Sequence, residues 1–219
     1  MTNKLLILLL LQFTFSPIWG YATGINRNFS HRPLYVGALG GYGSTTWNGL
    51  VPTTQNQSEA LNISTPISVK EGGGIWGILT GYEFNHLFAI EAAYMHYPKA
   101  TVTFDMLSIF SFDHNNTTEL SSQTEMINLM AKLMLEIPNS GLRLFSSAGV
   151  ADIHRKDILL NEWHVSPSFG VGVNYRINEH FMGELGGNYA AGFGTSQLNP
   201  ADNYIPFLYS ITLRLAYFI

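Results

Sequence analysis

The C-terminal sequence YSITLRLAYFI, from Tyr209 to Ile219, alternates strictly between large apolar residues and a second, mostly polar set. The apolar set is Tyr209, Ile211, Leu213, Leu215, Tyr217 and Ile219, and the residues between them are Ser210, Thr212, Arg214, Ala216 and Phe218. A period of two predicts a β-strand with one apolar face. This apolar face has a tyrosine at its start and another near its end. That is typical of a strand that crosses a bilayer, because aromatic side chains collect at both membrane–water interfaces. We therefore expect this strand to close a transmembrane β-barrel.

The composition of the chain fits such a barrel. Charged residues make up 12% of the 219 residues, against about 25% in an ordinary soluble domain. No internal run reaches the roughly 18 consecutive apolar residues of a membrane-spanning helix. The absence of cysteine excludes a disulfide framework and a lipoprotein thiol. A net charge of −4 without a basic cluster argues against a nucleic-acid partner.

The first 22 residues have the pattern of a secretory signal peptide. Lys4 supplies the positive start, the run from Leu5 to Phe15 is apolar, and Gly20-Tyr21-Ala22 is a small-x-small cleavage site. The sequence thus predicts a signal peptide over residues 1–22 and a barrel domain over residues 23–219. Such a protein is exported through the periplasm to the bacterial outer membrane.

The same alternation recurs along the chain and predicts eight strands. It is especially clear from Ile127 to Ile137, where every odd position is apolar and the even positions include Asn128, Lys132 and Glu136. The predicted strands are Leu34–Gly43, Gly74–Phe84, Phe88–Tyr97, Ile127–Ile137, Leu142–Ala151, Ser166–Ile177, Met182–Tyr189 and Tyr209–Ile219.

The connections between these strands alternate in length. Three are tight turns, at Asn85–Leu87, Pro138–Gly141 and Asn178–His180, and four are long, at about 44–73, 98–125, 152–162 and 190–205. Short periplasmic turns and long extracellular loops are typical of outer-membrane barrels. Two of the tight turns, 93 residues apart, open with an asparagine, which tolerates the backbone conformation that such turns need. We interpret these two hairpins as equivalent.

The arrangement resembles a family of small eight-stranded outer-membrane barrels, namely the OmpA transmembrane domain, OmpX and the opacity-type surface proteins. The resemblance lies in YVGALGGY (residues 35–42), in GYEF (81–84) leading to FAIEA (88–92), and in the terminal Tyr217, Phe218 and Ile219. It implies an all-β, up-and-down transmembrane barrel. It also implies a C-terminal assembly signal, read by the barrel assembly machinery, although Phe218 is penultimate here and Arg214 stands where many such signals carry glycine.

Eight charged residues lie on the predicted inward face, four of each sign. Since unpaired buried charge is costly, they are expected to form a structural ion-pair network inside a narrow lumen. The tight turns place Glu136 opposite Arg143 and Asn174 opposite Glu184. The alternative is a small porin-like channel lined by the same charges. The eight residues are Glu83, Glu91, Lys132, Glu136, Arg143, Arg176, Glu184 and Arg214.

One pair of residues raises the question of an enzyme. Lipid A deacylases of this fold carry a His-x-Ser motif with a downstream acid, and this chain has His164 and Ser166. Both would face the lumen near the outer rim, whereas the nearest downstream acid, Glu179, lies at the opposite turn, and a triad needs contact among all three groups. We therefore predict no catalytic, cofactor-binding or metal-binding residues, and keep a lipid A-modifying enzyme as a disfavoured alternative.

The loop over 98–125 is the best candidate for a binding surface. Its stretches Thr101–Phe104 and Met106–Phe112 are strand-like and aromatic, so two barrel strands are expected to continue above the membrane as a hairpin whose free edge binds a partner. The alternative is that these residues pack on neighbouring loops. The candidate binding residues are Phe104, Ile109, Phe110 and Phe112.

The sequence thus predicts a non-enzymatic outer-membrane anchor. It would display loops for adhesion or for contact with a host or environmental surface, with a part in envelope integrity. The expected partners are outer-membrane lipid, lipopolysaccharide, the barrel assembly machinery and an extracellular ligand.

Overall fold

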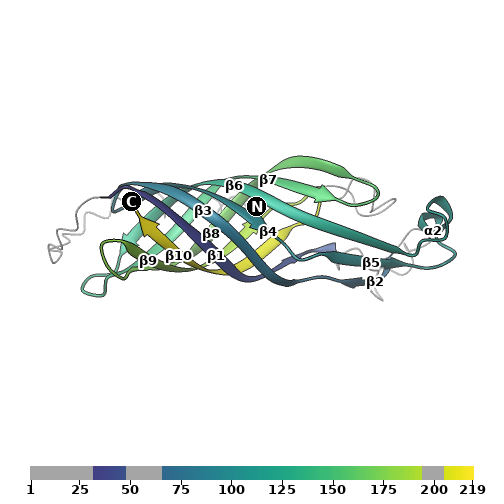
Figure 1. Ribbon diagram of the computed structural model, residues 1–219, viewed down its shortest axis with the longest axis horizontal. Coiled ribbons are helices and arrows are strands. Elements are labelled where there is room, and N and C mark those ends of the chain that lie inside the picture. Colours follow the sequence, from purple (N-terminus) through teal and green to yellow (C-terminus); the bar gives the residue numbers. More distant parts are fainter. Residues whose placement is uncertain (1–31, 48–65, 194–204) are drawn as a thin grey trace, which may run out of the picture.

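The structure is a computed structural model that describes residues 32–47, 66–193 and 205–219. The predicted signal peptide and most of the first and last long loops lie outside these ranges. Eight long antiparallel strands form a closed barrel, with β2, β5 and α2 extending from one end (Figure 1). The barrel strands are β1 (Leu34–Thr45), β3 (Gly73–Asn85), β4 (Phe88–His96), β6 (Glu119–Glu136), β7 (Leu142–Lys156), β8 (Asn161–Arg176), β9 (Phe181–Ala190) and β10 (Leu208–Phe218).

Two pairings close the sheet into a barrel. β1 pairs with β10 from Tyr35↔Phe218 to Thr45↔Leu208, and β6 pairs with β7 along the whole overlap of these strands. The remaining barrel strands pair with their neighbours in the chain. The prediction of an eight-stranded antiparallel barrel is confirmed.

The outer and inner faces follow the alternation read from the sequence. The six predicted lipid-facing residues, five on β10 and Ile219 just after it, are exposed, Leu213 to 68%, whereas the neighbouring Thr212 is fully buried. The first strand, whose glycines left its facing open, turns Tyr35 and Leu39 inward and Val36 and Tyr42 outward. Within the described ranges, no helix is long and apolar enough to cross a membrane.

Three barrel strands run further than the sequence predicted. β6 begins at Glu119, eight residues before the predicted start at Ile127, and β7 and β8 meet at the four-residue turn 157–160. The stretch 152–162 is therefore mostly a hairpin, not a long loop. The outward residues of the β6 and β7 extensions are polar, among them Gln123, Glu125 and His154, so the apolar alternation that located these strands stops before they do.

The second long loop forms a protrusion above the barrel. β5 (Ala100–Phe104) pairs with the start of β6, and β2 (Pro66–Lys70), from the first long loop, pairs with β5. The expected hairpin extension is present. Its tip differs from the prediction, because α2 (Ile109–Asp113) replaces the expected strand. The Ser108 hydroxyl accepts a hydrogen bond from the Ser111 amide at 3.1 Å and so caps this short helix.

The two asparagine turns have the same hydrogen bonds. The Asn85 side-chain oxygen accepts from the amides of Leu87 and Phe88, each at 2.8 Å. The Asn178 oxygen accepts from the amides two and three residues further on, also at 2.8 Å. This shared geometry supports the equivalence of the two hairpins.

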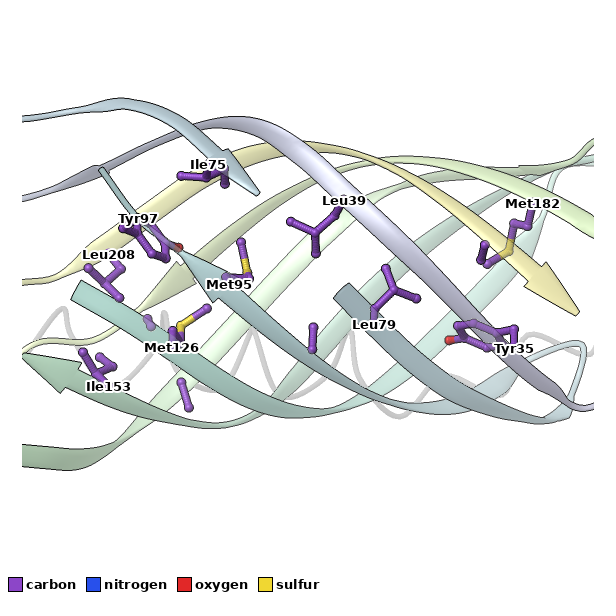
Figure 2. Close-up of a cluster of buried hydrophobic side chains, with 14 of the residues drawn as sticks. Tyr35, Leu39, Ile75, Leu79, Met95, Tyr97, Met126, Ile153, Met182 and Leu208 are labelled. Carbon is purple, nitrogen blue, oxygen red and sulfur yellow. The ribbon is translucent and has the colours of Figure 1, made fainter. Parts of the chain in front are cut away.

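Inward-facing apolar side chains occupy much of the lumen. Figure 2 shows Tyr35, Met182 and Leu79 toward one end, and Tyr97, Met126 and Ile153 toward the other. The sequence suggested a mostly polar inner face, but the inner face also carries many apolar side chains. Among the described residues, the inward charged side chains include a layer between these apolar groups, the Glu83–Arg143 pair, Arg176 near one end and Arg155 near the other.

Candidate functional site

Four charged side chains form a closed network inside the barrel. Glu91 on β4 contacts Lys132 at 3.3 Å and Arg214 at 2.6 Å. Glu184 on β9 contacts Arg214 at 3.1 Å and also pairs with Lys132. Each carboxylate thus meets both bases, and each base meets both carboxylates. We call these four residues the lumen network.

Polar and aromatic neighbours complete the lumen network. The Tyr35 hydroxyl donates a hydrogen bond to Glu91 at 3.0 Å. Arg214 donates to the side-chain oxygens of Asn188 at 2.9 Å and Thr212 at 3.1 Å. The Lys132 ammonium group lies 4.2 Å from the centre of the Phe145 ring. These contacts use donors that would otherwise lose hydration on burial.

A second ion pair lies outside the lumen network. Arg143 contacts Glu83 at 2.6 Å and donates to Asn174 at 2.8 Å. The predicted register of Glu136 opposite Arg143 is present, yet Glu136 is exposed at the end of β6. Because Glu83 is buried within reach across the lumen, Arg143 pairs with it instead. Of the eight predicted lumen charges, Glu136 is the one that is exposed, since it lies on the inward side of β6 but at its very end.

The inward face at the same end of the barrel as the C-terminus is lined by Arg176 and aromatic rings. The Arg176 guanidinium lies 4.3 Å from the centre of the Phe218 ring, which lies 5.2 Å from the Tyr35 ring. Phe218 is fully buried, whereas Tyr217 and Ile219 face outward. Of the three predicted assembly-signal residues, only these two present side chains to the membrane.

The lumen network is buried and electrically balanced. Its four residues are each 2–5% exposed, and two carboxylates face two bases. Removing any one member would leave uncompensated buried charge, which is strongly unfavourable. The arrangement is therefore suited to holding the barrel shut and rigid.

The candidate catalytic pair is not assembled. Ser166 is buried, and its hydroxyl has no hydrogen-bond partner among the described residues. His164 lies on the predicted inward side of β8, opposite Ile153, but it is exposed at the rim, and its ring packs edge-on against Phe193 at 4.5 Å. No base is therefore in place to take a proton from Ser166.

The described part of the chain holds no group of three or more His, Cys, Asp or Glu side chains arranged for a metal ion.

The protrusion above the barrel has a hydrophobic core of its own. Phe104 and Phe110 are buried and stack with ring centres 4.1 Å apart. The Trp47 ring, fully buried, lies 4.8 Å from the Arg155 guanidinium, which pairs with Asp157 at 2.6 Å. This loop core joins residues of three loops, namely Trp47, Val69, Ala100, Val102, Phe104, Phe110, Leu120 and Leu159.

The candidate binding residues of the loop thus separate into two groups. Phe104 and Phe110 lie inside the loop core, as the alternative of packing on neighbouring loops predicted. Their side chains are therefore not accessible to a binding partner. Phe112 is 67% exposed beside Met106 and Leu107, which are exposed to a similar extent. We call these three residues the apolar tip. Ile109 begins α2, and its side chain lies outside the described part of the structure.

The edge of the protrusion also differs from expectation. β5 has β6 on one side and β2 on the other, so it cannot accept a further strand. Among the described strands, β2 is the outermost. Its proline at one end and Lys70 at the other are residues that discourage pairing at an edge.

Some lumen residues were missed by sequence reasoning. Tyr35, Asn188 and Thr212 bind the charged side chains directly. Asn188 and Thr212 lie on the predicted inward faces of their strands, which was an available signal. Tyr35 lies on a glycine-rich strand whose alternation did not distinguish its faces.

Comparison with known proteins gives a family match. A family model described as the outer membrane protein beta-barrel domain matches residues 27–217. A comparison with curated proteins finds no match. Several solved barrels are similar at low identity.

Neisserial surface protein A is 13% identical with a TM-score of 0.49, over 85% of this chain and 97% of that chain. The N-terminal β-barrel domain of Pseudomonas aeruginosa OprF is 13% identical with a TM-score of 0.44, over 84% and 96%. Yersinia pestis Ail, in complex with the heparin analogue sucrose octasulfate, is 12% identical with a TM-score of 0.41, over 84% and 98%.

Proposed function

Because the chain belongs to the outer membrane protein beta-barrel domain family, we propose that it is a non-enzymatic anchor that binds an external surface through its loop protrusion. The barrel holds the protein in the outer membrane, and the loop core holds the apolar tip away from it. The ligand is a host or environmental surface with an apolar patch, and firm anchoring contributes to envelope integrity.

The apolar tip is the observation that carries this proposal. Met106, Leu107 and Phe112 are 74%, 72% and 67% exposed in a part of the chain outside the membrane. Adjacent large apolar side chains exposed to water are typical of an interaction site. They stand on a strand pair and helix whose own core is already filled, so they are not needed to stabilise the protrusion.

The interior supports an anchor in preference to a channel. The lumen network and the apolar side chains around it lie in the path that an ion would take. Opening that path would require breaking buried ion pairs, each worth several kcal/mol once a partner is removed.

The test replaces the tip and keeps its support. Bacteria displaying the protein with Met106→Ser, Leu107→Ser and Phe112→Ser should bind cultured host cells or matrix-coated surfaces roughly tenfold less well, as when anchoring residues of an interface are truncated. Ile158→Ser is the matched control, because Ile158 is 61% exposed on the neighbouring β7–β8 turn.

Barrel content of the outer membrane, measured by heat-dependent gel mobility, should be equal in all variants. Undiminished binding by the triple variant at equal surface display would contradict the proposal.

A further inference from the structure

A row of five side chains crosses the outer wall of the barrel near its extracellular end. Trp76 on β3 pairs with His96 on β4, His96 with Glu125 on β6, Glu125 with His154 on β7, and His154 with Trp163 on β8. All five point away from the lumen. We call them the rim row. Its order, Trp-His-Glu-His-Trp, is the same read from either side.

The side chains of the rim row contact one another. The Nδ1 atoms of His96 and His154 lie 3.5 and 3.9 Å from the two oxygens of Glu125. The Trp76 ring stacks on His96 with centres 5.4 Å apart, and the Trp163 ring stacks on His154 at 4.5 Å. The aromatic pairs thus fix both imidazoles beside one carboxylate.

Glu125 retains capacity to accept hydrogen bonds. Its distances to the two imidazoles are longer than a good hydrogen bond. Gln123 donates to one oxygen at 3.2 Å, and Tyr94 also hydrogen-bonds the carboxylate. A carboxylate has about four acceptor positions, so some remain for a ligand.

A second carboxylate lies just below the rim row. Asp152 is two residues from His154 on the same face of β7 and pairs with Ile127 and Val165. Its Oδ1 atom is enclosed and has no hydrogen-bond partner among the described residues. An enclosed carboxylate oxygen without a donor is unfavourable. Asp152 as a whole is only partly buried, so its carboxyl group borders the outer surface beside the rim row.

The rim row lies at the level of lipid headgroups. Below it the outward faces are apolar, with Ile127, Leu129 and Val150 about half exposed, and above it the strands leave the membrane as the protrusion. Ionisable side chains on the lipid face cost little at this interface and about 2–4 kcal/mol for Arg or Lys at the bilayer midplane. The extracellular end faces the outer leaflet.

We propose that the rim row and Asp152 bind the sugar headgroup of lipopolysaccharide. Carboxylates accept hydrogen bonds from sugar hydroxyls, the free indole faces pack on sugar rings, and the imidazoles with nearby Lys156 contact phosphates. The row spans four strand spacings, about 19 Å. That width suits a headgroup of several sugars and far exceeds a single phospholipid headgroup.

The shape of the wall disfavours a second copy of the chain as the occupant. Nearer the tight turns, four of these five strands, β4, β6, β7 and β8, form a lipid-facing groove of about 450 Å³. Two identical concave surfaces facing each other would leave a void, whereas acyl chains can fill a groove. The groove includes Phe88, Ala131, Leu133, Ala148, Phe169 and Val171.

The test compares lipid retained by matched variants. The full mature chain is extracted from outer membranes in mild detergent, and lipopolysaccharide and phospholipid per barrel are counted by native mass spectrometry. The native barrel should retain lipopolysaccharide above its share of the membrane, and Glu125→Gln with Asp152→Asn should reduce this several-fold. Glu136→Gln with Glu179→Gln removes two exposed acids at the opposite end and should change nothing.

Two outcomes would overturn the proposal. One is native retention by the Glu125→Gln, Asp152→Asn variant, and the other is a native barrel that retains phospholipid in preference to lipopolysaccharide. Heat-dependent gel mobility shows whether each variant is folded. If the first variant does not fold, Trp76→Leu with Trp163→Leu keeps apolar side chains at the interface and should lower lipopolysaccharide retention in the same way.

Discussion

Lys132 is one of the two bases on which the lumen network depends. Its ammonium group meets both Glu91 and Glu184 and also lies over the Phe145 ring. Arg214 contacts the same two carboxylates, but one cation cannot balance two buried anions. Loss of the positive charge on Lys132 should therefore destabilise the barrel.

Replacing Lys132 with methionine should destabilise the barrel by about 3–5 kcal/mol, the usual cost of removing one partner of a buried ion pair. Methionine keeps most of the length of the side chain, so the effect comes from the missing charge. Urea unfolding of the refolded protein in detergent or vesicles, followed by gel mobility, measures it. Glu136→Gln on the same strand is the control and should change stability by less than about 0.5 kcal/mol.

Equal stability of Lys132→Met and the native protein would contradict a coupled network. In that case Glu91 or Glu184 would have to be neutral already.

At the scale of residues, the sequence predicted which charged side chains face the lumen, but it did not predict their ion-pair partners. Glu136 was assigned to Arg143 from the turn alone, which fixes neighbours along the sheet. Arg143 instead meets Glu83 across the lumen, and that distance depends on the closure and tilt of the barrel. Phe218 faces inward because it alternates with Tyr217, a consequence of strand period that the resemblance to a terminal signal obscured.

At the scale of elements, two hairpin turns depend on a single side-chain oxygen each. Asn85 and Asn178 each accept two backbone hydrogen bonds at 2.8 Å. Replacement of either by alanine should lower stability by about 1–2 kcal/mol, since a typical hydrogen bond contributes about 0.5–1.5 kcal/mol. Equilibrium unfolding in urea is the measurement.

Replacement of the same asparagines by aspartate is the matched control, because aspartate keeps the accepting oxygen. Asn178→Asp should remain close to the native protein. Equal losses for the alanine and aspartate variants would show that the oxygen is not what holds these turns.

The limits of the strands were harder to predict than their existence. Inside the membrane one face must be apolar, so the alternation is strict. Above it, the extension of β6 and the β7–β8 hairpin are held by pairing and by the loop core, and the helix α2 by the Ser108 cap. The partners that stabilise these segments lie far away in the sequence, such as Trp47 beside Arg155.

For the whole molecule, the plugged interior predicts a barrel that does not conduct. The mature chain from Thr23, refolded and inserted into a planar bilayer, should show stable insertion without conductance steps. A variant in which Glu91, Lys132, Glu184 and Arg214 are all alanine removes the charged layer without leaving unpaired charge. It should show steps where the native protein shows none.

Reproducible steps from the native protein would instead favour the small-channel alternative. In that case the steps should change when Lys132 or Arg176 is replaced.

The seam between the first and last strands also governs how the protein is made. Tyr35 pairs with Phe218, and the Ile219 amide donates to the Leu34 carbonyl at 2.9 Å. Contacts between residues so distant in sequence form slowly, because a long loop must close first. The seam cannot form until the final residues have been synthesised and exported. During that interval the unsealed chain exposes lipid-facing residues and open strand edges to water, which makes it prone to aggregate until it is inserted.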